Sequence, residues 1–415
     1  MTYRPDGPRA PWEGRRVVLG VSGGIAAYKV VQVARDLTLL GCTVDVVLTR
    51  AAGEFVRPLS FEGVTGRSCH TDLFSADGAA LHIRLGREAD VVCVAPATAD
   101  LLARVSQGRA DDLLTTTLLA TRAPVLLCPA MNDRMWAHPQ VQENAARCRA
   151  LGHHLVGPAD GRLAVGESDG PGRLVEPHEI VAWVGRALGR DGPLSGRRVV
   201  VTAGPTREAV DPVRYLGNRS SGRMGYALAE AAWLAGAEVT LVSGPSNLAD
   251  PVGVETVRVE SAVDMLEAAR GPISSADVTI YAAAVADFRP IEAAPDKIKR
   301  ARTGPRVDLE LTANPDIARE TTPLRRPGSV AVGFALETDD LMAGAYAKLE
   351  AKGFDLIVAN DARDPEAGFE VETNRVTLVQ AGVPDESLPV LSKRVVADRV
   401  MARVASLFGD EGRSS

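Results

Sequence analysis

The amino-acid sequence predicts an α/β protein made of two doubly wound, mostly parallel sheet domains. Two observations support this fold class. Short apolar runs typical of buried strands alternate with segments of helical periodicity, and this alternation stops at the polar stretch GRDGPLSG and then starts again. Parallel strands need a helical crossover between them, so a repeated strand–helix order indicates a parallel sheet in each half.

The strand patterns of the first half are RRVVLGVS, TVDVVLT, ADVVCVAPA and APVLLCPA. Between the first two lies IAAYKVVQVARDLTLLG, which has the spacing of an amphipathic helix. We therefore expect a flavodoxin-like or Rossmann-like domain over residues 1–190, with its ligand at the carboxyl ends of the strands.

The second half starts again with RRVVVTAG and continues with AEVTLVSG, ADVTIYAAAVAD, VAVGFALE, FDLIVAND and RVTLVQ as strand patterns. We expect a second, Rossmann-like domain over residues 191–415. The two halves share the strand–turn–helix order without repeating each other's sequence.

Composition narrows the function classes. The formal net charge of -6 argues against a nucleic-acid partner. The chain shows no signal peptide and no apolar stretch of the roughly 18 residues that a membrane helix needs, so we expect no membrane partner and a cytoplasmic location. All six His and all five Cys fall before residue 180. The second half must therefore work with carboxylates, amides, Lys, Arg or a bound cofactor.

The first glycine-rich turn, GVSGGIAAYK, lies where a strand meets a helix. A dinucleotide site would need G-x-G-x-x-G here and an acidic residue at the end of the second strand, where the chain instead has Thr49 and Arg50. Amides at a helix N-terminus beside the Ser22 hydroxyl suit a single phosphate. FMN fits this pattern better than NAD, and a tight turn without a ligand is the open alternative.

Three later segments, ALHIRLGREAD, APATADLLARVSQGRADDL and PAMNDRMW, give the chain its resemblance to a known family. With them, it resembles the flavoproteins that decarboxylate a cysteine carboxylate, specifically the bifunctional enzymes of coenzyme A biosynthesis. The resemblance implies that Ser22, Gly23 and Gly24 hold the phosphate of FMN. It implies further flavin contacts from Thr49, Thr98 and Asp100.

The same resemblance assigns two catalytic side chains. His82 would be the acid/base, although its alternation with Leu81, Ile83 and Leu85 by itself favours a histidine on the solvated face of a strand. Asn132 would bind the substrate carboxylate through its amide. Without the resemblance, capping of the helix that begins at DRMW explains Asn132 equally well.

The loop GRLAVGESDGPGRL matches the flap that covers the substrate in this family. Many members carry a cysteine about where Val165 stands, and that cysteine is thought to supply a proton in the final reduction. Here Glu167, Ser168, Asp169 or water would have to serve, or the reaction stops at the enethiol. The last outcome is the alternative function, a flavin-dependent oxidative cysteine decarboxylase.

In the second half, TAGPTREAVDPVRYLGNRSSGRMG places arginines between a strand and a helix, which is an anion site or a solvated loop. Together with AAAVADFRP, PDKIKR, GFALETDD and YAKLEAK, it resembles the CTP-dependent phosphopantothenate-cysteine ligase. The resemblance implies that Asn218 holds the acyl cytidylate, that Arg214 assists the second half-reaction and that Lys297 supports cysteine-dependent turnover.

A nucleotide site follows from the same resemblance. Its implied members are Asp287, Lys297, Phe334, Lys348 and Lys352. Asp287 would bind Mg2+ or the nucleotide, and Lys348 and Lys352 would meet the triphosphate because their i, i+4 spacing puts both on one helix face. From spacing alone, that face would be merely solvated, and Phe334 could equally belong to the core.

The resulting hypothesis is a bifunctional enzyme that uses 4'-phosphopantothenate, cysteine and CTP, with Mg2+ and FMN. Ligation in the second domain would feed decarboxylation in the first. Family analogy implies a homo-oligomer in which flavin-domain trimers and ligase-domain dimers build a closed dodecamer. A third reading, a non-enzymatic flavin-fold interaction protein, predicts loss of His82 or Asn132, and both are present.

Overall fold

The computed structural model describes residues 7–74, 80–162, 169–300, 304, 306–337, 341–361 and 371–409. Val165, which stands in place of the flap cysteine, and two of the candidate proton donors, Glu167 and Ser168, lie outside the described residues.

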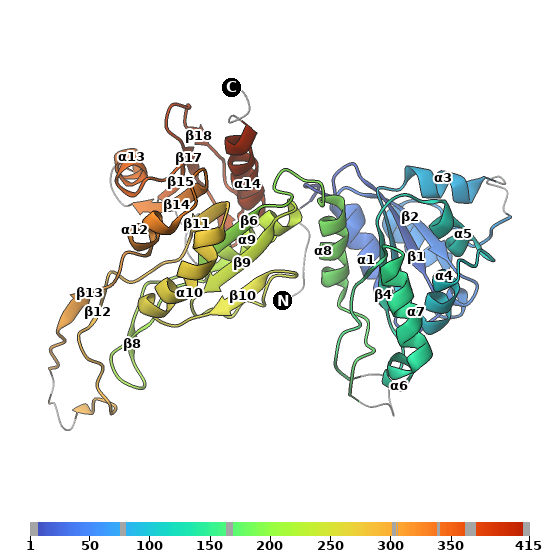
Figure 1. The fold of residues 1–415 in the computed structure, drawn as a ribbon, viewed down its shortest axis with the longest axis horizontal. Coiled ribbons are helices and arrows are strands. Elements are labelled where there is room, and N and C mark those ends of the chain that lie inside the picture. The colour runs from blue at the N-terminus through green and yellow to red at the C-terminus, as the bar shows by residue number, and fades with distance from the viewer. Residues whose placement is uncertain are drawn as a thin grey trace. The chain divides into compact units, whose positions relative to one another are not determined.

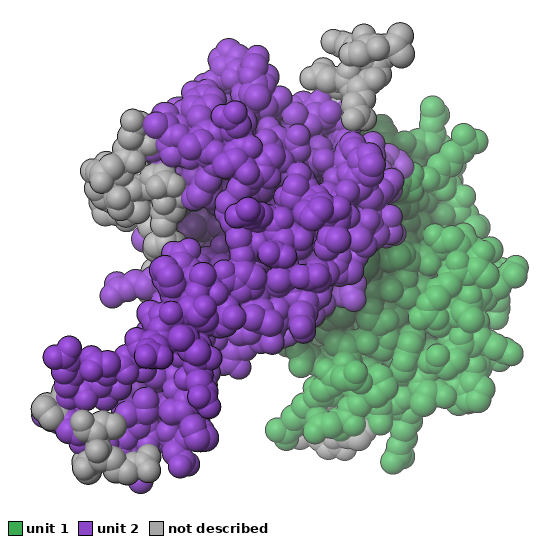
Figure 2. All heavy atoms as spheres, turned by 60° about the vertical axis from the view of Figure 1, so that its left-hand side comes forward, with its two compact units in different colours: residues 1–190 green, residues 191–415 purple. Residues whose placement is uncertain are grey.

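The chain divides into two compact units, unit 1 with residues 1–190 and unit 2 with residues 191–415 (Figure 2). Each unit is built around a sheet whose central strands are parallel, with helices packed on its faces (Figure 1). The fold class is therefore α/β in both halves, as the sequence predicts.

Unit 1 contains a five-stranded parallel sheet in the order β2-β1-β3-β4-β5. Its strands are β1 (Arg16–Val21), β2 (Thr43–Leu48), β3 (Val91–Ala97), β4 (Val125–Pro129) and β5 (His154–Leu155). All residues of β3 and β4 are buried, as expected for strands covered on both faces. These are the four strand patterns predicted from the sequence plus one short edge strand.

Helices cover both faces of this sheet (Figure 1). They are α1 (Ala27–Leu39), the 3-10 turn η1 (Ala52–Glu54), α2 (Pro58–Thr65), α3 (Leu81–Glu88), α4 (Ala99–Ser106), α5 (Leu113–Ala120), α6 (Asp133–Ala137), α7 (Pro139–Ala150) and α8 (Pro177–Leu188). Apolar side chains of α3, α4, α5 and α7 form one core with the sheet, while α1 and α8 pack together on the other face.

The segment LHIRLGRE is helix α3, so the strand reading of His82 is wrong. Alternating apolar residues over five positions also fit one and a half helical turns. Leu81 and Leu85, spaced i, i+4, are buried, whereas Ile83 between them is 41% exposed. The helical period therefore decides which apolar side chains enter the core.

Unit 2 contains an eight-stranded sheet in the order β10-β9-β6-β11-β14-β15-β17-β18, in which β17 and β18 are antiparallel to their neighbours. The strands are β6 (Arg198–Ala203), β9 (Glu238–Ser243), β10 (Glu255–Arg258), β11 (Val278–Tyr281), β14 (Val330–Glu337), β15 (Leu356–Asp361), β17 (Thr377–Val379) and β18 (Glu386–Ser387). Three two-stranded pairs accompany this sheet: β7 (Glu208–Ala209) with β8 (Tyr215–Leu216), β12 (Phe288–Pro290) with β13 (Leu311–Ala313), and β16 (Thr373–Asn374) with β19 (Leu391–Ser392).

Among its described residues, unit 2 has the helices α9 (Arg223–Leu234), α10 (Ala262–Ser275), α12 (Ile317–Thr321), the 3-10 turn η2 (Thr322–Leu324), α13 (Leu341–Lys352) and α14 (Lys393–Gly409). Helix α9 lies very close to β6, because a Cβ on Gly225 would come within 2.5 Å of the Cβ of Ala203. The β12–β13 pair projects from the body of unit 2 as an arm and contacts β7 at its base (Figures 1 and 2). No helix in the described part of the chain has the length and apolar content of a membrane span.

Candidate functional sites

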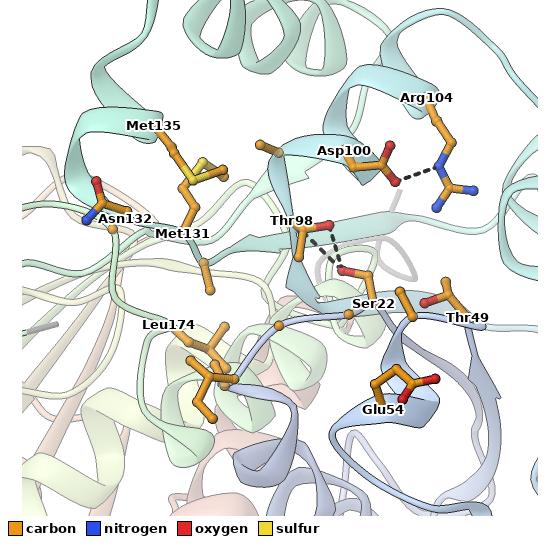
Figure 3. Close-up of a pocket in the computed structure, with 18 of the residues that line it drawn as sticks. Ser22, Thr49, Glu54, Thr98, Asp100, Arg104, Met131, Asn132, Met135 and Leu174 are labelled. Atoms are coloured by element: carbon orange, nitrogen blue, oxygen red, sulfur yellow. Dashed lines mark hydrogen bonds and ion pairs between the residues drawn. The ribbon is translucent and has the colours of Figure 1, made fainter. Parts of the chain in front are cut away.

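Unit 1 holds a cavity of about 1200 Å³ at the carboxyl ends of its parallel strands. Seven of the residues predicted from the sequence line it (Figure 3): Ser22, Gly23, Gly24, Thr49, Thr98, Asp100 and Asn132. They follow β1, β2, β3 and β4 directly in sequence. The parallel register brings these four strand ends to one edge, which is why residues more than 100 positions apart meet here.

The glycine-rich turn presents unpaired amides to this cavity. Helix α1 has Ala26 as its N-cap, without a side-chain hydrogen bond and without an acidic residue in the first turn. Within the described ranges, no protein acceptor is found for the amides of Gly23 and Gly24. A helix N-terminus with free amides and no acidic cap is suited to an anionic group such as phosphate.

Ser22 is buried at the base of the turn, and its hydroxyl connects two strand ends. The Oγ of Ser22 donates to the carbonyl oxygen of Pro96 at 2.7 Å, and it accepts from the amide of Thr98 at 3.1 Å. These bonds fix the end of β1 against the end of β3. Ser22 therefore shapes the turn in addition to lining the cavity.

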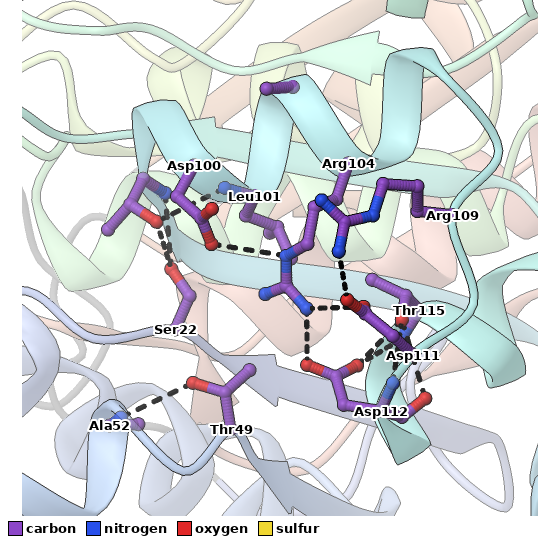
Figure 4. A network of polar contacts seen from close by, with 12 residues as sticks. Ser22, Thr49, Ala52, Asp100, Leu101, Arg104, Arg109, Asp111, Asp112 and Thr115 are labelled. Carbon is purple, nitrogen blue, oxygen red and sulfur yellow. Dashed lines mark hydrogen bonds and ion pairs between the residues drawn. The ribbon is translucent and has the colours of Figure 1, made fainter.

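A polar network forms one wall of the cavity (Figure 4). The guanidinium of Arg104 bonds Asp100 at 3.1 Å, Asp111 at 3.1 Å and Asp112 at 2.6 Å, and Arg109 adds a second bond to Asp111. The carboxylate of Asp100 is thus already paired in the protein. Sequence reasoning placed Asp100 here but missed Arg104, although the i, i+4 spacing of the two was a visible signal.

Asp112 makes a pH-dependent contribution to stability. It caps α5 through the amide of Thr115 at 2.8 Å. Burial raises the pKa of Asp112, but the Thr115 amide and Arg104 outweigh burial and leave the pKa below its ordinary value. The stabilisation is therefore complete above the unfolded-state pKa of about 3.9 and is lost as the pH falls through the lower folded-state value.

We expect Asp112→Ala to lower the free energy of unfolding by about 1 kcal/mol near neutral pH. Urea unfolding of both proteins at about pH 6 and about pH 3.5 should show this difference shrinking in acid. Asp111→Ala is the control. It removes another partner of Arg104, one that caps no helix, and should lower the free energy of unfolding by less. A difference between wild type and Asp112→Ala that stays constant with pH would contradict the role of the charged cap.

Asn132 caps a helix, as its position before DRMW predicts, and it also lies at the cavity. Its Oδ1 accepts from the amide of Arg134 at 3.0 Å and so caps α6, and the residue also lines the cavity. In the part of the chain that the structure describes, its amide nitrogen has no protein partner. That nitrogen is the group that can donate to a carboxylate.

His82 is not among the described residues that line the cavity of its own chain. It sits in the first turn of α3, and its Nδ1 is buried with no partner in the described structure.

The closing part of the flap lies against the loop that carries Asn132. The amide of Met131 donates to the carbonyl oxygen of Gly172 at 2.9 Å. Lys29 and Arg173, which both line the cavity, each pair with Glu176. Helix α1 and the described end of the flap thus each contribute a cation to the cavity, and sequence reasoning identified neither.

In unit 2, a chain of contacts connects Asn218, Asp287 and Lys352. The amide nitrogen of Asn218 donates to the carbonyl oxygen of Val285 at 2.8 Å. The amide of Asn314 donates to the carbonyl oxygen of Asp287 at 2.8 Å. These segments follow β11 and β13, and they place two of the predicted residues near each other.

Lys352 joins this group through Asp316, with its Nζ 3.0 Å from the carboxylate. Asp316 also caps α12, and sequence reasoning did not single it out within ANPDIA. Lys348 lies half-buried one turn earlier on α13, and Phe334 lies half-buried in β14.

Arg214 and Lys297 lie in two segments that hydrogen-bond to each other beside the β7–β8 pair. Asp287 is a single carboxylate, and the described residues contain no cluster of three His, Cys, Asp or Glu that could hold a metal ion by themselves.

Two family models match the chain. The model described as Flavoprotein covers residues 8–189. The model described as DNA/pantothenate metabolism flavoprotein C-terminal domain covers residues 194–408, just over half of the chain.

Curated relatives match over nearly the whole length. The coenzyme A biosynthesis bifunctional protein CoaBC of Vibrio vulnificus strain CMCP6 is 43% identical over 398 residues, which are 95% of this chain and 98% of the relative. The protein of the same name from Mycobacterium tuberculosis strain H37Rv is 44% identical over 408 residues, 95% of this chain and 97% of the relative.

Solved structures match each unit separately. The C-terminal domain of a CoaBC protein is 39% identical, covers 53% of this chain and 99% of its own, and has a TM-score of 0.45. The FMN-dependent cysteine decarboxylase SpaF is 36% identical, covers 38% of this chain and 91% of its own, and has a TM-score of 0.35.

Proposed function

The chain belongs to the family of bifunctional coenzyme A biosynthesis proteins, with a flavoprotein decarboxylase unit followed by a ligase unit, and from this we propose its substrates, cofactors and residue roles. Unit 2 joins 4'-phosphopantothenate to cysteine at the expense of CTP, and unit 1 decarboxylates the product to 4'-phosphopantetheine. The assignment of unit 1 rests mainly on its cavity. Seven of the predicted residues line this cavity, and the start of α1 beside it has no side-chain cap.

FMN is the flavin that this cavity fits. The free amides of Gly23 and Gly24 at a helix N-terminus suit a single phosphate, and Gly23 leaves no room for a side chain. When bound, FMN supplies the electron sink that lets the cysteinyl carboxylate leave as CO2. Asn132 would orient that carboxylate through its amide nitrogen, and His82 would move the proton at the thiol.

The ligase reaction consists of two transfers. The carboxylate of 4'-phosphopantothenate attacks the α-phosphate of CTP, pyrophosphate leaves, and an acyl cytidylate forms. The cysteine amine then attacks the acyl carbon, the amide bond forms, and CMP leaves. Positive charge stabilises both steps, and unit 2 supplies it from Lys and Arg because it contains no His or Cys.

We assign Lys348 and Lys352 to the triphosphate, Phe334 to the wall of the nucleotide pocket and Asn218 to the acyl cytidylate. Asp287 would bind Mg2+. A lone carboxylate fits this role because Mg2+ takes one or two carboxylates and completes its shell with substrate phosphates and water. Arg214 and Lys297 would act in the attack by cysteine.

We further propose a homo-oligomer built from trimers of unit 1 and dimers of unit 2 into a dodecamer. Large apolar side chains are exposed in both units: Ile25, Tyr28, Leu59, Ile83, Leu119, Phe288, Ile291, Leu309 and Leu311. We propose that a second copy of the chain covers these apolar side chains. Each of them lies at the cavity rim, on a helix face or on the β12–β13 arm.

A cytoplasmic location is consistent with the state of the five cysteines, which are all free thiols. The oxidative alternative, which would stop at the enethiol, is not favoured. Relatives at 43% identity over 95% of this chain carry the bifunctional name, and an isolated decarboxylase would not need unit 2.

The test uses purified full-length protein with 4'-phosphopantothenate, cysteine, CTP and Mg2+ under anaerobic conditions, with products followed by mass spectrometry and the flavin spectrum recorded alongside. We expect CTP-dependent release of pyrophosphate followed by 4'-phosphopantetheine. Accumulation of an enethiol with a bleached flavin would favour the oxidative alternative, and would show that Val165 leaves the flap without a proton donor. No consumption of CTP would overturn the ligase assignment.

A further inference from the structure

Asp211 is a buried carboxylate within an exposed loop of unit 2. It lies between β7 and β8 and is 4% exposed, whereas the residues that follow it are exposed. Its Oδ1 accepts from the amides of Val213 at 2.8 Å and Arg214 at 2.9 Å. These bonds close a tight turn in which the aspartate side chain caps its own loop.

The second oxygen of Asp211 joins two segments that are far apart in sequence. Its Oδ2 accepts from Nη1 of Arg214 at 2.7 Å and from the amide of Ile298 at 3.1 Å. The same Nη1 donates to the carbonyl oxygen of Ile298 at 2.9 Å. One carboxylate therefore holds the Arg214 guanidinium against the peptide that follows Lys297.

The ionised form of Asp211 is the one that this geometry favours. Burial opposes it, but the amides of Val213, Ile298 and Arg214 and the charge of Arg214 leave the pKa of Asp211 below its ordinary value. All the partners are donors, so both carboxylate oxygens are fully used as acceptors.

We propose that Asp211 is a positioning residue for the amide-forming half-reaction, holding Arg214 and Lys297 in one arrangement. This inference rests on the proposed ligase function. Arg214 is half-exposed, so its side chain would not keep a single conformation without a fixed partner. For Lys297, which is exposed, the bond that the Ile298 amide donates to Asp211 fixes the backbone next to it. Within the described chain, the Arg214 guanidinium has no further protein partner, which leaves Nε and Nη2 available as donors.

Two residues that we assign to the nucleotide and Mg2+, Asp287 and Lys352, belong to a separate group of contacts, and Lys297 is the residue that the nucleotide site and the cysteine step share. Asp287, Asp316 and Lys352 are connected through Asn314 and α12. Formation of the acyl cytidylate and its capture by cysteine should therefore respond differently to loss of the Asp211 carboxylate. A residue that only stabilised the fold would affect both steps together.

The sharpest variant is Asp211→Asn. The side-chain oxygen of the asparagine can still accept from the Val213 and Arg214 amides. Its NH2 group would take the place of Oδ2 and face two other donors, Nη1 of Arg214 and the Ile298 amide, so those two hydrogen bonds would be lost. In the full chain, single-turnover formation of acyl cytidylate from CTP and 4'-phosphopantothenate should be much less affected than the cysteine-dependent step. Cysteine-dependent amide formation should fall about 100-fold, so that acyl cytidylate accumulates.

A second variant, Asp211→Ser, keeps one oxygen for the turn, removes the Oδ2 acceptor and should give the same separation of the two half-reactions. In either background, adding Arg214→Gln should cause little further loss, because Asp211 acts through Arg214. Additive losses would overturn the proposal.

Asp277→Asn is the matched control. Asp277 also bonds a backbone amide, that of Arg198 at 2.8 Å, and an arginine, Arg326 at 3.0 Å, but it lies directly before β11, at the amino-terminal ends of the parallel strands. It should leave the ratio of the two half-reactions unchanged. Equal slowing of both half-reactions by Asp211→Asn, or no effect on amide formation, would overturn the proposal. Absence of pyrophosphate release by the wild type would instead show that the proposed ligase function itself is wrong.

Discussion

Gly23→Ala is expected to abolish flavin binding and decarboxylation while leaving the ligase reaction intact. A Cβ at this position would lie 2.4 Å from the Cβ of Ala51, 2.7 Å from its carbonyl carbon and 2.9 Å from its carbonyl oxygen. Two of these atoms are backbone, so rotation of a side chain cannot relieve the contact. The turn after β1 or the turn after β2 would have to move.

Both turns line the cavity, so either movement changes the place where the flavin phosphate would sit. The flavin content per chain, read from the visible absorption of the purified protein, should fall to background. Decarboxylation of supplied 4'-phosphopantothenoylcysteine should be lost with it. Ligase turnover by the same preparation shows that the chain has folded.

Gly53→Ala provides the control, because a Cβ on Gly53 meets nothing within 4 Å although the residue lies in the next turn of the chain. It should retain the flavin. Wild-type flavin content in Gly23→Ala would mean that the phosphate does not depend on this turn, and the flavin assignment of the cavity would have to be revised.

The sheet of unit 1 and most of its cavity could be predicted from local sequence. Central parallel strands are buried on both faces, so they appear as continuous apolar runs such as VVCVAPA. Once those runs were ordered, the rule that ligands bind at the carboxyl ends predicted where the ligand would lie, and the family resemblance singled out Thr49, Thr98 and Asn132 there. The structure brings these three residues to one cavity.

Other features depend on contacts that a sequence pattern does not encode. The Oδ2 of Asp211 bonds the backbone amide of Ile298, 87 positions away, and a backbone amide has no side-chain signature. Asp316 pairs with Lys352 across 36 positions, a separation that no local sequence pattern spans. The helix at His82 was missed because only its packing distinguishes buried Leu85 from exposed Ile83.

The position of His82 leads to the second large effect that we expect: two variants that are each inactive in decarboxylation should restore activity when they assemble together. Asn132 lines the cavity of its own chain and His82 does not, and we therefore propose that another copy supplies α3 to the decarboxylase site. Ile83 on α3 and Ile25 at the cavity rim are both exposed, as a shared surface between copies requires.

His82→Ala and Asn132→Ala should each be inactive in decarboxylation when produced alone. Produced together in one cell with different affinity tags and isolated as mixed oligomers, they should regain about a quarter of the wild-type activity. In an equal mixture, about one site in four receives His82 from one intact donor and Asn132 from another. Decarboxylation of supplied 4'-phosphopantothenoylcysteine is the measurement.

Co-production of Asn132→Ala with Gly23→Ala is the matched control. Both changes lie on the same cavity-forming side of one chain, so every shared site keeps one defect and no activity should return. Mixed oligomers of the first pair that form but stay inactive would mean that His82 acts within its own chain, which would require α3 to move toward the cavity. Restored activity in the first pair alone would place the two catalytic side chains on different subunits and make oligomerisation a requirement for decarboxylation.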